Sequence, residues 1–215
     1  MDEEEHKLRP LKCELFALSR PDGSAMLIQG DTAVLAAMYG PVEVKAQKMS
    51  IEKASVEAVY RPKVGVPRIA DKTREELIRN TCEISLMATL HPRTSVVVIL
   101  QEMQDSGGLL SCALNAGCLA LINSGISMKF LIAAVNCMIN KDDAVILDPD
   151  NKQLKESKAT LMFVFDNVQK NVVACHTSGM FSQTQFHECL LKCREASDIV
   201  FAFYRNIVNQ YANVV

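Results

Sequence analysis

The 215-residue sequence predicts a single α+β domain in which mixed sheets pack against helices. Three observations carry this prediction: a β-rich first third, one long apolar run between two helical stretches, and hairpins followed by a long C-terminal helix. Charged residues make up 22% of the chain with both signs mixed, which argues against intrinsic disorder. Hydrophobic residues make up 49%, which is ample for a buried core.

Short apolar runs bounded by turn residues predict the strands of the first part. The turn sequence Arg20–Gly23 separates the first two runs, and Gly30-Asp31 predicts a hairpin into the third. Alternating Val and Ala residues from Val42 to Tyr60 predict that the sheet continues. The three predicted strands are residues 13–18, 24–29 and 32–39.

The middle of the chain predicts a helix, a strand and a second helix. Thr73 with Glu76 forms a capping-box signature, which predicts a helix that begins there and ends before Pro92. The apolar run over 95–103 predicts a strand buried on both faces. Small residues over 111–123 predict a helix that lies close to a sheet.

The last third predicts two hairpins and a long helix. Ser182 with Gln185 forms a second capping box, and apolar residues follow it at helical spacing. The hairpins are predicted from residues 131–139 with 144–147, and from 159–165 with 171–176.

Composition also indicates in which compartment the protein is expected and which ligands it is expected to lack. Residues 1–10 predict a flexible acidic tail before a domain over 11–215, without the apolar segment of a signal peptide or a membrane span. The eight cysteines show no CxxC pair and no zinc-type Cys/His spacing, so they predict buried free thiols in a reducing compartment. We therefore expect a soluble intracellular protein with no metal, no cofactor and no membrane partner.

The most cationic stretch is a loop with two prolines and a glycine that runs into the first helix. Its basic residues are interpreted either as ordinary surface charges or as RNA phosphate contacts, which need only Arg and Lys within reach. A formal net charge of −2 argues against a stand-alone nucleic-acid binder. The candidate RNA-binding residues are Arg61, Lys63, Arg68, Lys72 and Arg74, with Arg93 a weaker candidate.

Three stretches of the sequence resemble the signatures of RNase PH domains. Gly23–Ala37 contains a Gly-Asp-Thr hairpin between two strands, and Gly107-Gly108 followed by Asn115–Leu121 resembles the glycine-rich entry to a small-residue helix. Asp148–Gln153 takes the place of an aspartate-containing loop after the central hairpin. The resemblance extends from about Leu11 to the last helix. The chain is similar to the RNase PH-like ring subunits of the eukaryotic RNA exosome.

This resemblance implies a split β-α-β topology and assembly with other RNase PH-like subunits, three pairs closing a six-membered ring around an RNA channel. It also implies cap subunits and a catalytic nuclease subunit as partners, and a location in nucleus, nucleolus and cytoplasm. Isolated from these partners, the chain is expected to be capable of forming a homodimer. The implied function is 3′-to-5′ RNA processing and degradation.

The residues that the resemblance makes catalytic are altered here. Active members use inorganic phosphate, held by a Thr-Arg pair directly after the double glycine, where this sequence has Leu109 and Leu110. Leucine offers neither charge nor a hydrogen bond to phosphate. The family's two metal-binding aspartates are six positions apart; Asp148 matches the first, but Leu154 replaces the second. We therefore predict a non-catalytic structural and RNA-channel subunit, with Asp148 as a vestigial candidate.

Two other functions stay open at this point. A homodimeric metal-dependent nuclease outside the exosome would use Asp148 with Asp150 or Glu156, and hydrolysis would not need the lost phosphate site. A protein-interaction module would need no RNA contact at all. The histidines at 91, 176 and 187 share no motif and are interpreted as structural or surface residues.

Overall fold

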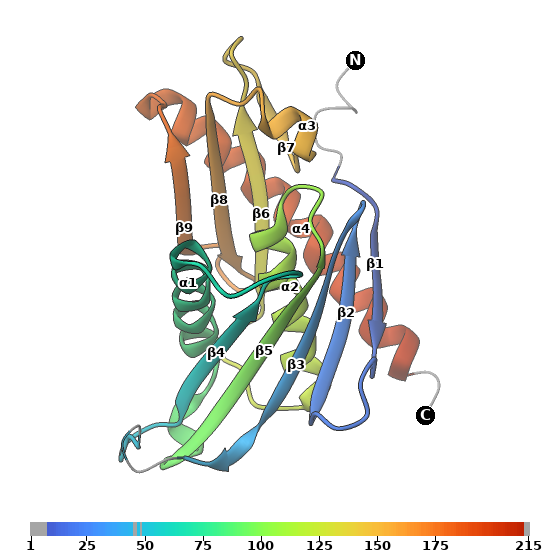
Figure 1. Ribbon diagram of the computed structural model, residues 1–215, viewed down its shortest axis with the longest axis vertical. Coiled ribbons are helices and arrows are strands. Elements are labelled where there is room, and N and C mark those ends of the chain that lie inside the picture. The colour runs from blue at the N-terminus through green and yellow to red at the C-terminus, as the bar shows by residue number, and fades with distance from the viewer. Residues whose placement is uncertain (1–7, 45–46, 48, 213–215) are drawn as a thin grey trace.

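The computed structural model describes residues 8–44, 47 and 49–212, which form two sheets and the helices that pack on them (Figure 1). In chain order the elements are β1 (Leu11–Leu15), β2 (Gly23–Gln29), β3 (Thr32–Glu43), β4 (Ser55–Arg61), α1 (Ile69–Ser85), the 3₁₀ turn η2 (Ala88–Leu90), β5 (Thr94–Gln104), α2 (Leu109–Ser124), β6 (Ile132–Ile139), β7 (Val145–Leu147), α3 (Asn151–Leu154), β8 (Ala159–Asp166), β9 (Val172–Gly179) and α4 (Gln183–Ala212).

One sheet is mixed and the other antiparallel. The five-stranded sheet has the order β1-β2-β3-β5-β4, in which β4 and β5 are parallel and are joined through α1. The four-stranded sheet has the order β7-β6-β8-β9, with antiparallel neighbours throughout. The predicted α+β class, with mixed sheets packed against helices, is confirmed.

Helix α2 is the centre of the core, because it packs against strands of both sheets. Small residues allow this close approach: a Cβ added to Gly23 of β2 would lie 2.3 Å from the carbonyl oxygen of Ala120. The buried side chain of Asn115 then ties three elements together. Its amide donates to the Ala134 carbonyl at 2.9 Å and its oxygen accepts from the Tyr204 hydroxyl at 3.0 Å. The two sheets are thus held in one fixed relation around α2.

Helix α4 is 30 residues long and runs obliquely behind the strands in Figure 1. The predicted capping box is present, since the Ser182 N–H donates to the Gln185 side chain at 2.9 Å and the Gln185 N–H donates back to the Ser182 hydroxyl at 3.3 Å. The far end of α4 reaches the first strand, where the Leu15 N–H donates to the Tyr211 hydroxyl at 3.2 Å. None of the described helices is both long and apolar enough to cross a membrane.

The first helix differs from its prediction at both ends. It begins at Ile69 rather than Thr73, because the Asp71 carboxylate accepts the Arg68 N–H at 2.9 Å and so closes a cap one turn earlier. The Thr73 hydroxyl instead donates to a carbonyl inside the helix at 3.3 Å. The helix ends at Ser85, well before Pro92, and the intervening chain forms the turn η2.

Two further expectations need correction. Strand β5 is fully buried on one face only: Val98 is buried, whereas Val97 and Ile99 are half-buried. Six of the eight free cysteines are buried as predicted, but Cys13 is half-buried and Cys175 is exposed on β9. The division into a tail and a domain at residue 11 stays a prediction; residues 1–7 lie outside the described residues.

Candidate active-site cleft

The loop between β5 and α2 divides the candidate site into two sides. Gly107 and Gly108 have φ angles of +106° and +63°, which favour glycine. A Cβ on Gly107 would also lie 2.5 Å from the Pro149 carbonyl oxygen. The loop therefore needs glycine both for its backbone conformation and for its contact with the segment that leads into α3.

One side of this loop is filled by the guanidinium group of Arg9. Its Nη2 contacts the Asp148 carboxylate at 2.5 Å and the Gly107 carbonyl at 3.0 Å, and its Nη1 donates to the Ser106 carbonyl at 3.3 Å. The Arg9 backbone N–H donates to the other Asp148 oxygen at 3.1 Å. Burial lowers the pKa of Arg9, but the hydrogen bond and negative charge of Asp148 outweigh it, so the pKa is raised. We name this set of contacts the Arg9 network.

Asp148 belongs to this network and does not line the cleft on the other side of the loop. Its side chain is 1% exposed, and both of its oxygens accept hydrogen bonds from Arg9. Asp150 also contacts Arg9, at 3.3 Å, and closes a capping box with Gln153 at the start of α3. Glu156 is exposed beyond α3. Within the part of the chain that the structure describes, no group of three or more His, Cys, Asp or Glu is arranged to hold a metal ion.

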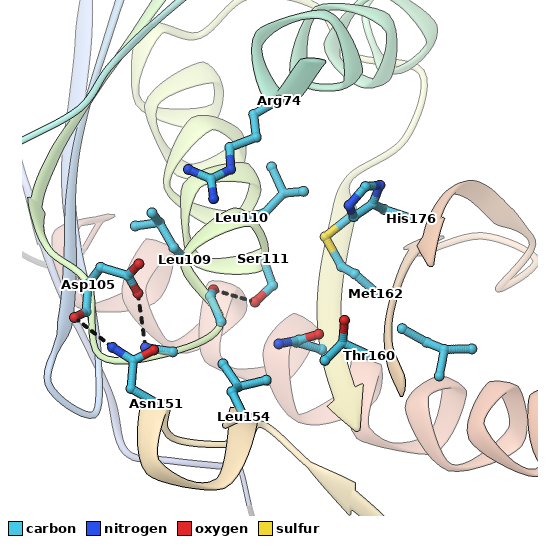
Figure 2. Close-up of a pocket in the computed structure, with 14 residues that line it drawn as sticks. Arg74, Asp105, Leu109, Leu110, Ser111, Asn151, Leu154, Thr160, Met162 and His176 are labelled. Atoms are coloured by element: carbon cyan, nitrogen blue, oxygen red, sulfur yellow. Dashed lines mark hydrogen bonds between the residues drawn. The ribbon is translucent and has the colours of Figure 1, made fainter. Parts of the chain in front are cut away.

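The other side of the loop is an open cleft of about 210 Å³ at the N-terminus of α2 (Figure 2). It brings together the three leucines that the sequence singled out: Leu109 and Leu110 from the first turn of α2, and Leu154 from α3. Arg74 reaches toward the cleft from α1, on the side of Leu110 in Figure 2. Strands β6, β8 and β9 supply further lining side chains, among them Asn136, Thr160, Met162 and His176.

Hydrogen bonds shape the floor of this cleft rather than a binding group for phosphate. The Gly107 N–H donates to the Asp105 carboxylate at 3.0 Å, and the Asn151 amide donates to the Asp105 carbonyl at 3.1 Å. The Ser111 hydroxyl donates to the Gly108 carbonyl at 2.7 Å. These contacts fix the loop, while the first two helical residues present aliphatic side chains to the open space.

The basic residues predicted to contact RNA separate into two groups. Lys63, Arg68 and Arg74 line a second cleft, of about 370 Å³, which shares Arg74 and Asp105 with the first. Arg74 also pairs with Asp71 at 3.1 Å. Two others do not line either cleft: Lys72 pairs with Glu75 at 2.8 Å, and Arg61 is exposed at the end of β4. Arg93 lies beyond η2, where its N–H donates to the Ser50 carbonyl at 3.2 Å.

Sequence reasoning missed the part of the cleft that β8 and β9 supply. Thr160 and His176 face it from neighbouring strands. The alternation of side chains along β8 could have indicated Thr160, but nothing in the sequence locates β8 beside α2.

Comparisons with known proteins agree with this architecture. A family model described as the 3′ exoribonuclease family, domain 1, matches residues 7–127. The chain is 34% identical to an exosome complex exonuclease RRP46 homolog from Arabidopsis thaliana, over 95% of this chain and 93% of the relative. It is 31% identical to exosome complex component RRP46 from Saccharomyces cerevisiae, over 86% of this chain and 91% of the relative.

Solved structures of similar proteins share the fold of this chain. The crystal structure of rice (Oryza sativa) Rrp46 superposes with a TM-score of 0.91 at 35% identity, covering 95% of this chain and 97% of that one. An archaeal exosome core chain superposes with a TM-score of 0.82 at 18% identity, covering 94% and 88%, which shows a shared fold. The predicted resemblance to RNase PH domains is confirmed, and this chain belongs to the 3′ exoribonuclease family of RNase PH type.

Proposed function

We propose that this chain is a subunit of the RNA exosome core ring that supports 3′-to-5′ RNA processing and degradation without catalysing phosphorolysis. The relatives with the same length and fold carry the names of exosome components. The observation that carries the proposal is the cleft at the N-terminus of α2, where Leu109, Leu110 and Leu154 stand together. Three aliphatic side chains occupy the place where phosphorolysis needs charge.

Phosphorolysis needs phosphate beside an anionic RNA, so cations and a divalent metal must offset the charge. In this cleft the one cation among the described lining residues is Arg74, and it is already paired with Asp71. Of the two positions that match the metal-binding aspartates, Asp148 is held by Arg9 and Leu154 is not a carboxylate. Leucine beside phosphate leaves charged oxygens without a partner, which is costly.

The alternative of a metal-dependent nuclease is weakened by the Arg9 network. Asp148 was its first ligand, but both oxygens of that carboxylate accept hydrogen bonds from Arg9, and the side chain is 1% exposed. A cation of the protein already neutralises it, and a metal ion would have to displace that guanidinium. Asp150 faces the same guanidinium and Glu156 lies apart in solvent.

RNA contact is proposed for the basic surface next to the cleft. Lys63, Arg68 and Arg74 line one hollow, together with the carboxylates of Asp71, Glu102 and Asp105. Arg61 and Lys72 lie next to these residues in the sequence. Such contacts hold the RNA backbone and carry no base information. The absence of a site for phosphate chemistry does not affect them, so a chain inert in catalysis can still guide RNA.

The position of the chain in the ring, its partners, its location in the cell and its self-association belong to the same proposal. Within the ring we place this chain in the position of the small single-domain subunit called exosome component five, on the resemblance of Arg79–Glu83, Thr89–Thr94 and Leu147–Pro149. Its partners would be the other RNase PH-like subunits of a six-membered ring, the cap subunits and a catalytic nuclease subunit, in nucleus, nucleolus and cytoplasm. A homodimer is proposed for the isolated chain.

Two measurements test the function. We expect the pure chain to release no nucleoside diphosphate from 3′-labelled RNA with phosphate and Mg²⁺ present; phosphate-dependent release would refute the proposal. In the assembled exosome, Lys63, Arg68 and Arg74 changed together to Glu should reduce RNA crosslinking to this subunit about tenfold, because phosphate contacts dominate affinity. Lys141, Lys155 and Arg205, three exposed basic residues elsewhere, changed to Glu provide the charge-matched control.

A further inference from the structure

The cleft at the N-terminus of α2 and the second cleft meet at one cation and one carboxylate. Their linings differ in most residues, but Arg74 and Asp105 belong to both. Arg74 comes from α1, and Asp105 directly follows β5. Figure 2 shows both side chains on the side of the cleft where Leu109 lies. A strand of RNA that passes from one cleft to the other would therefore contact both charges.

The Arg74 guanidinium is held in place by its neighbours and keeps donors for an anion. Its Nη1 donates to Asp71 at 3.1 Å, and its carbon lies 5.9 Å from the centre of the Tyr60 ring. Tyr60 is buried, and its hydroxyl donates to Glu102 at 2.8 Å, which fixes the ring beneath Arg74. Among the described residues no acceptor binds Nη2 or Nε of Arg74. These donors can therefore bind a phosphate group.

The Asp105 carboxylate has one oxygen engaged and one oxygen open. Its Oδ1 accepts the Gly107 N–H at 3.0 Å, which fixes the orientation of the group. Within the described part of the chain no donor binds Oδ2, and no cation is paired with this exposed carboxylate. A bare carboxylate repels the phosphates of RNA. Its place beside Arg74 is favourable to RNA binding only if the RNA itself offers it a hydrogen-bond donor.

We propose that Asp105 is a residue by which this subunit distinguishes RNA from DNA, accepting a hydrogen bond from a ribose 2′-hydroxyl while Arg74 donates to a nearby phosphate. The inference rests on the RNA contact proposed above. The backbone of RNA offers an acceptor at every phosphate but a donor only at the 2′-hydroxyl. Deoxyribose has no such donor and leaves the carboxylate without a partner. Both groups contact the backbone, so the preference does not depend on base sequence.

The two other carboxylates of the second cleft are less suited to this role. Both oxygens of Asp71 are engaged, one by Arg74 and the other by the Arg68 N–H at 2.9 Å. Glu102 accepts the Tyr60 hydroxyl and lines only the second cleft. Asp105 is thus the carboxylate that combines an open oxygen with a position where the two clefts meet.

Photocrosslinking in the reconstituted ring measures the preference. Strands of one base sequence are prepared with ribose, 2′-deoxyribose or 2′-fluororibose, and crosslinks to this subunit are normalised to those with the other subunits. The 2′-fluoro sugar keeps the pucker of ribose but cannot donate. We expect the ribose strand to crosslink about tenfold more than either other strand, because a hydrogen bond to a carboxylate is a strong one. Equal crosslinking of the ribose and 2′-fluoro strands would refute the proposal and leave the RNA contact standing.

Two matched variants assign the preference to one carboxylate. Asp105→Asn keeps an oxygen for the Gly107 N–H, but its amide nitrogen cannot accept from a hydroxyl. We expect the preference for ribose to fall to about twofold or less while crosslinking of the 2′-fluoro strand rises, since a negative charge is gone. Glu102→Gln removes one charge from the second cleft and keeps an oxygen for the Tyr60 hydroxyl. It should raise crosslinking of both strands alike and retain the full preference.

The remaining outcomes are also decisive. Full preference in the Asp105→Asn ring, or its loss in the Glu102→Gln ring, would refute the assignment to Asp105. A disturbed loop alone would lower crosslinking of both strands together, and that result would refute it as well. No crosslink of any strand to this subunit would overturn the proposed RNA contact and this inference with it. The comparison of strands uses the natural chain, so it does not depend on the stability of a variant.

Discussion

The two sides of the Gly107–Gly108 loop differ in almost every physical respect. On one side the Arg9 network buries two opposite charges and pairs them, and both Nη atoms and the backbone N–H of Arg9 donate to carbonyls and carboxylates, while Nε is left without a partner. On the other side the cleft is open and presents Leu109, Leu110 and Leu154. The loop backbone is common to both. The polar groups of the Arg9 network therefore serve the architecture, while the cleft presents three leucines among polar side chains such as Arg74, Thr160 and His176.

The two sides of the loop meet two separate requirements, the conformation of the loop and the chemistry of a reaction. In an active enzyme both requirements fall on the same region. A loop that holds the start of α2 must keep its backbone conformation whether or not a reaction follows. The Arg9 network meets that demand from a residue before the first strand, 139 positions from Asp148 in the sequence. In the cleft, Leu110 and Leu154 are half-buried, whereas Leu109 is 6% exposed and packs in the hydrophobic core. Four substitutions test this division, in order of expected effect.

The largest effect is expected for Arg9→Ala. Removing the guanidinium leaves the buried Asp148 carboxylate without its partner, which should lower the free energy of unfolding by about 3–5 kcal/mol. Denaturant unfolding followed by circular dichroism measures the loss. Arg9→Lys is the control: it keeps the charge but not the fork of donors, and should cost less. A loss under about 1 kcal/mol for Arg9→Ala would mean that the network is not a structural element.

A smaller loss is expected for Gly107→Ala. The residue has a φ of +106°, and its new Cβ would lie 2.5 Å from the Pro149 carbonyl oxygen. Backbone strain alone costs about 1–3 kcal/mol, and the contact adds to it. Gly65→Ala provides a matched control, since φ is +89° there and nothing lies within 4 Å of the added Cβ. Equal unfolding free energies for the two variants would show that the contact with the α3 segment is dispensable.

Asp148→Asn should affect stability and leave any cleavage unchanged. The substitution replaces one acceptor by a donor that faces Arg9, and a loss of about 1–3 kcal/mol is expected. If preparations show Mg²⁺-dependent RNA cleavage, its rate should be the same in the variant. Cleavage abolished in a folded Asp148→Asn protein would instead assign Asp148 to a metal site.

The last test lies on the cleft side and measures ligand binding rather than stability, since Leu109 is 6% exposed and its replacement also disturbs the core. Leu109→Thr with Leu110→Arg restores the phosphate-binding pair of active members, and should bind inorganic phosphate with a Kd of about 1 mM by calorimetry. It should still release no nucleoside diphosphate, because Leu154 supplies no carboxylate for a metal and Asp148 is bound by Arg9. Leu109→Ala with Leu110→Ala, which adds no phosphate donor, is the control. Phosphorolysis by the first variant would show that the pair alone had been missing.

Local patterns predicted the elements whose signals lie within a few residues. The hairpin of β6 and β7 and the capping box of α4 were expected from contiguous sequence, and both are confirmed. The predicted start of α1 at Thr73 was wrong because the cap that forms is between Arg68 and Asp71, and that contact depends on the path of the preceding loop.

The candidate site was less predictable because its decisive contacts are distant in sequence. Asp148 looked like a metal ligand by spacing, but its partner Arg9 comes from the other end of the chain. The leucines of the cleft were identified from their neighbours in sequence, whereas Thr160 and His176 enter it only through the packing of β8 and β9. The motif thus predicted where the loop lies in the sequence. Only the tertiary structure shows which residues lie on each side of the loop.

The hydrogen bond between the Leu15 N–H and the Tyr211 hydroxyl joins residues 196 positions apart. During synthesis the first strand is made long before the last turn of α4, so its final partner is absent while most of the chain leaves the ribosome. Domains generally fold as units, and those that depend on distant contacts fold slowly. This chain should therefore reach its native state only after Tyr211 has been synthesised and has left the ribosome.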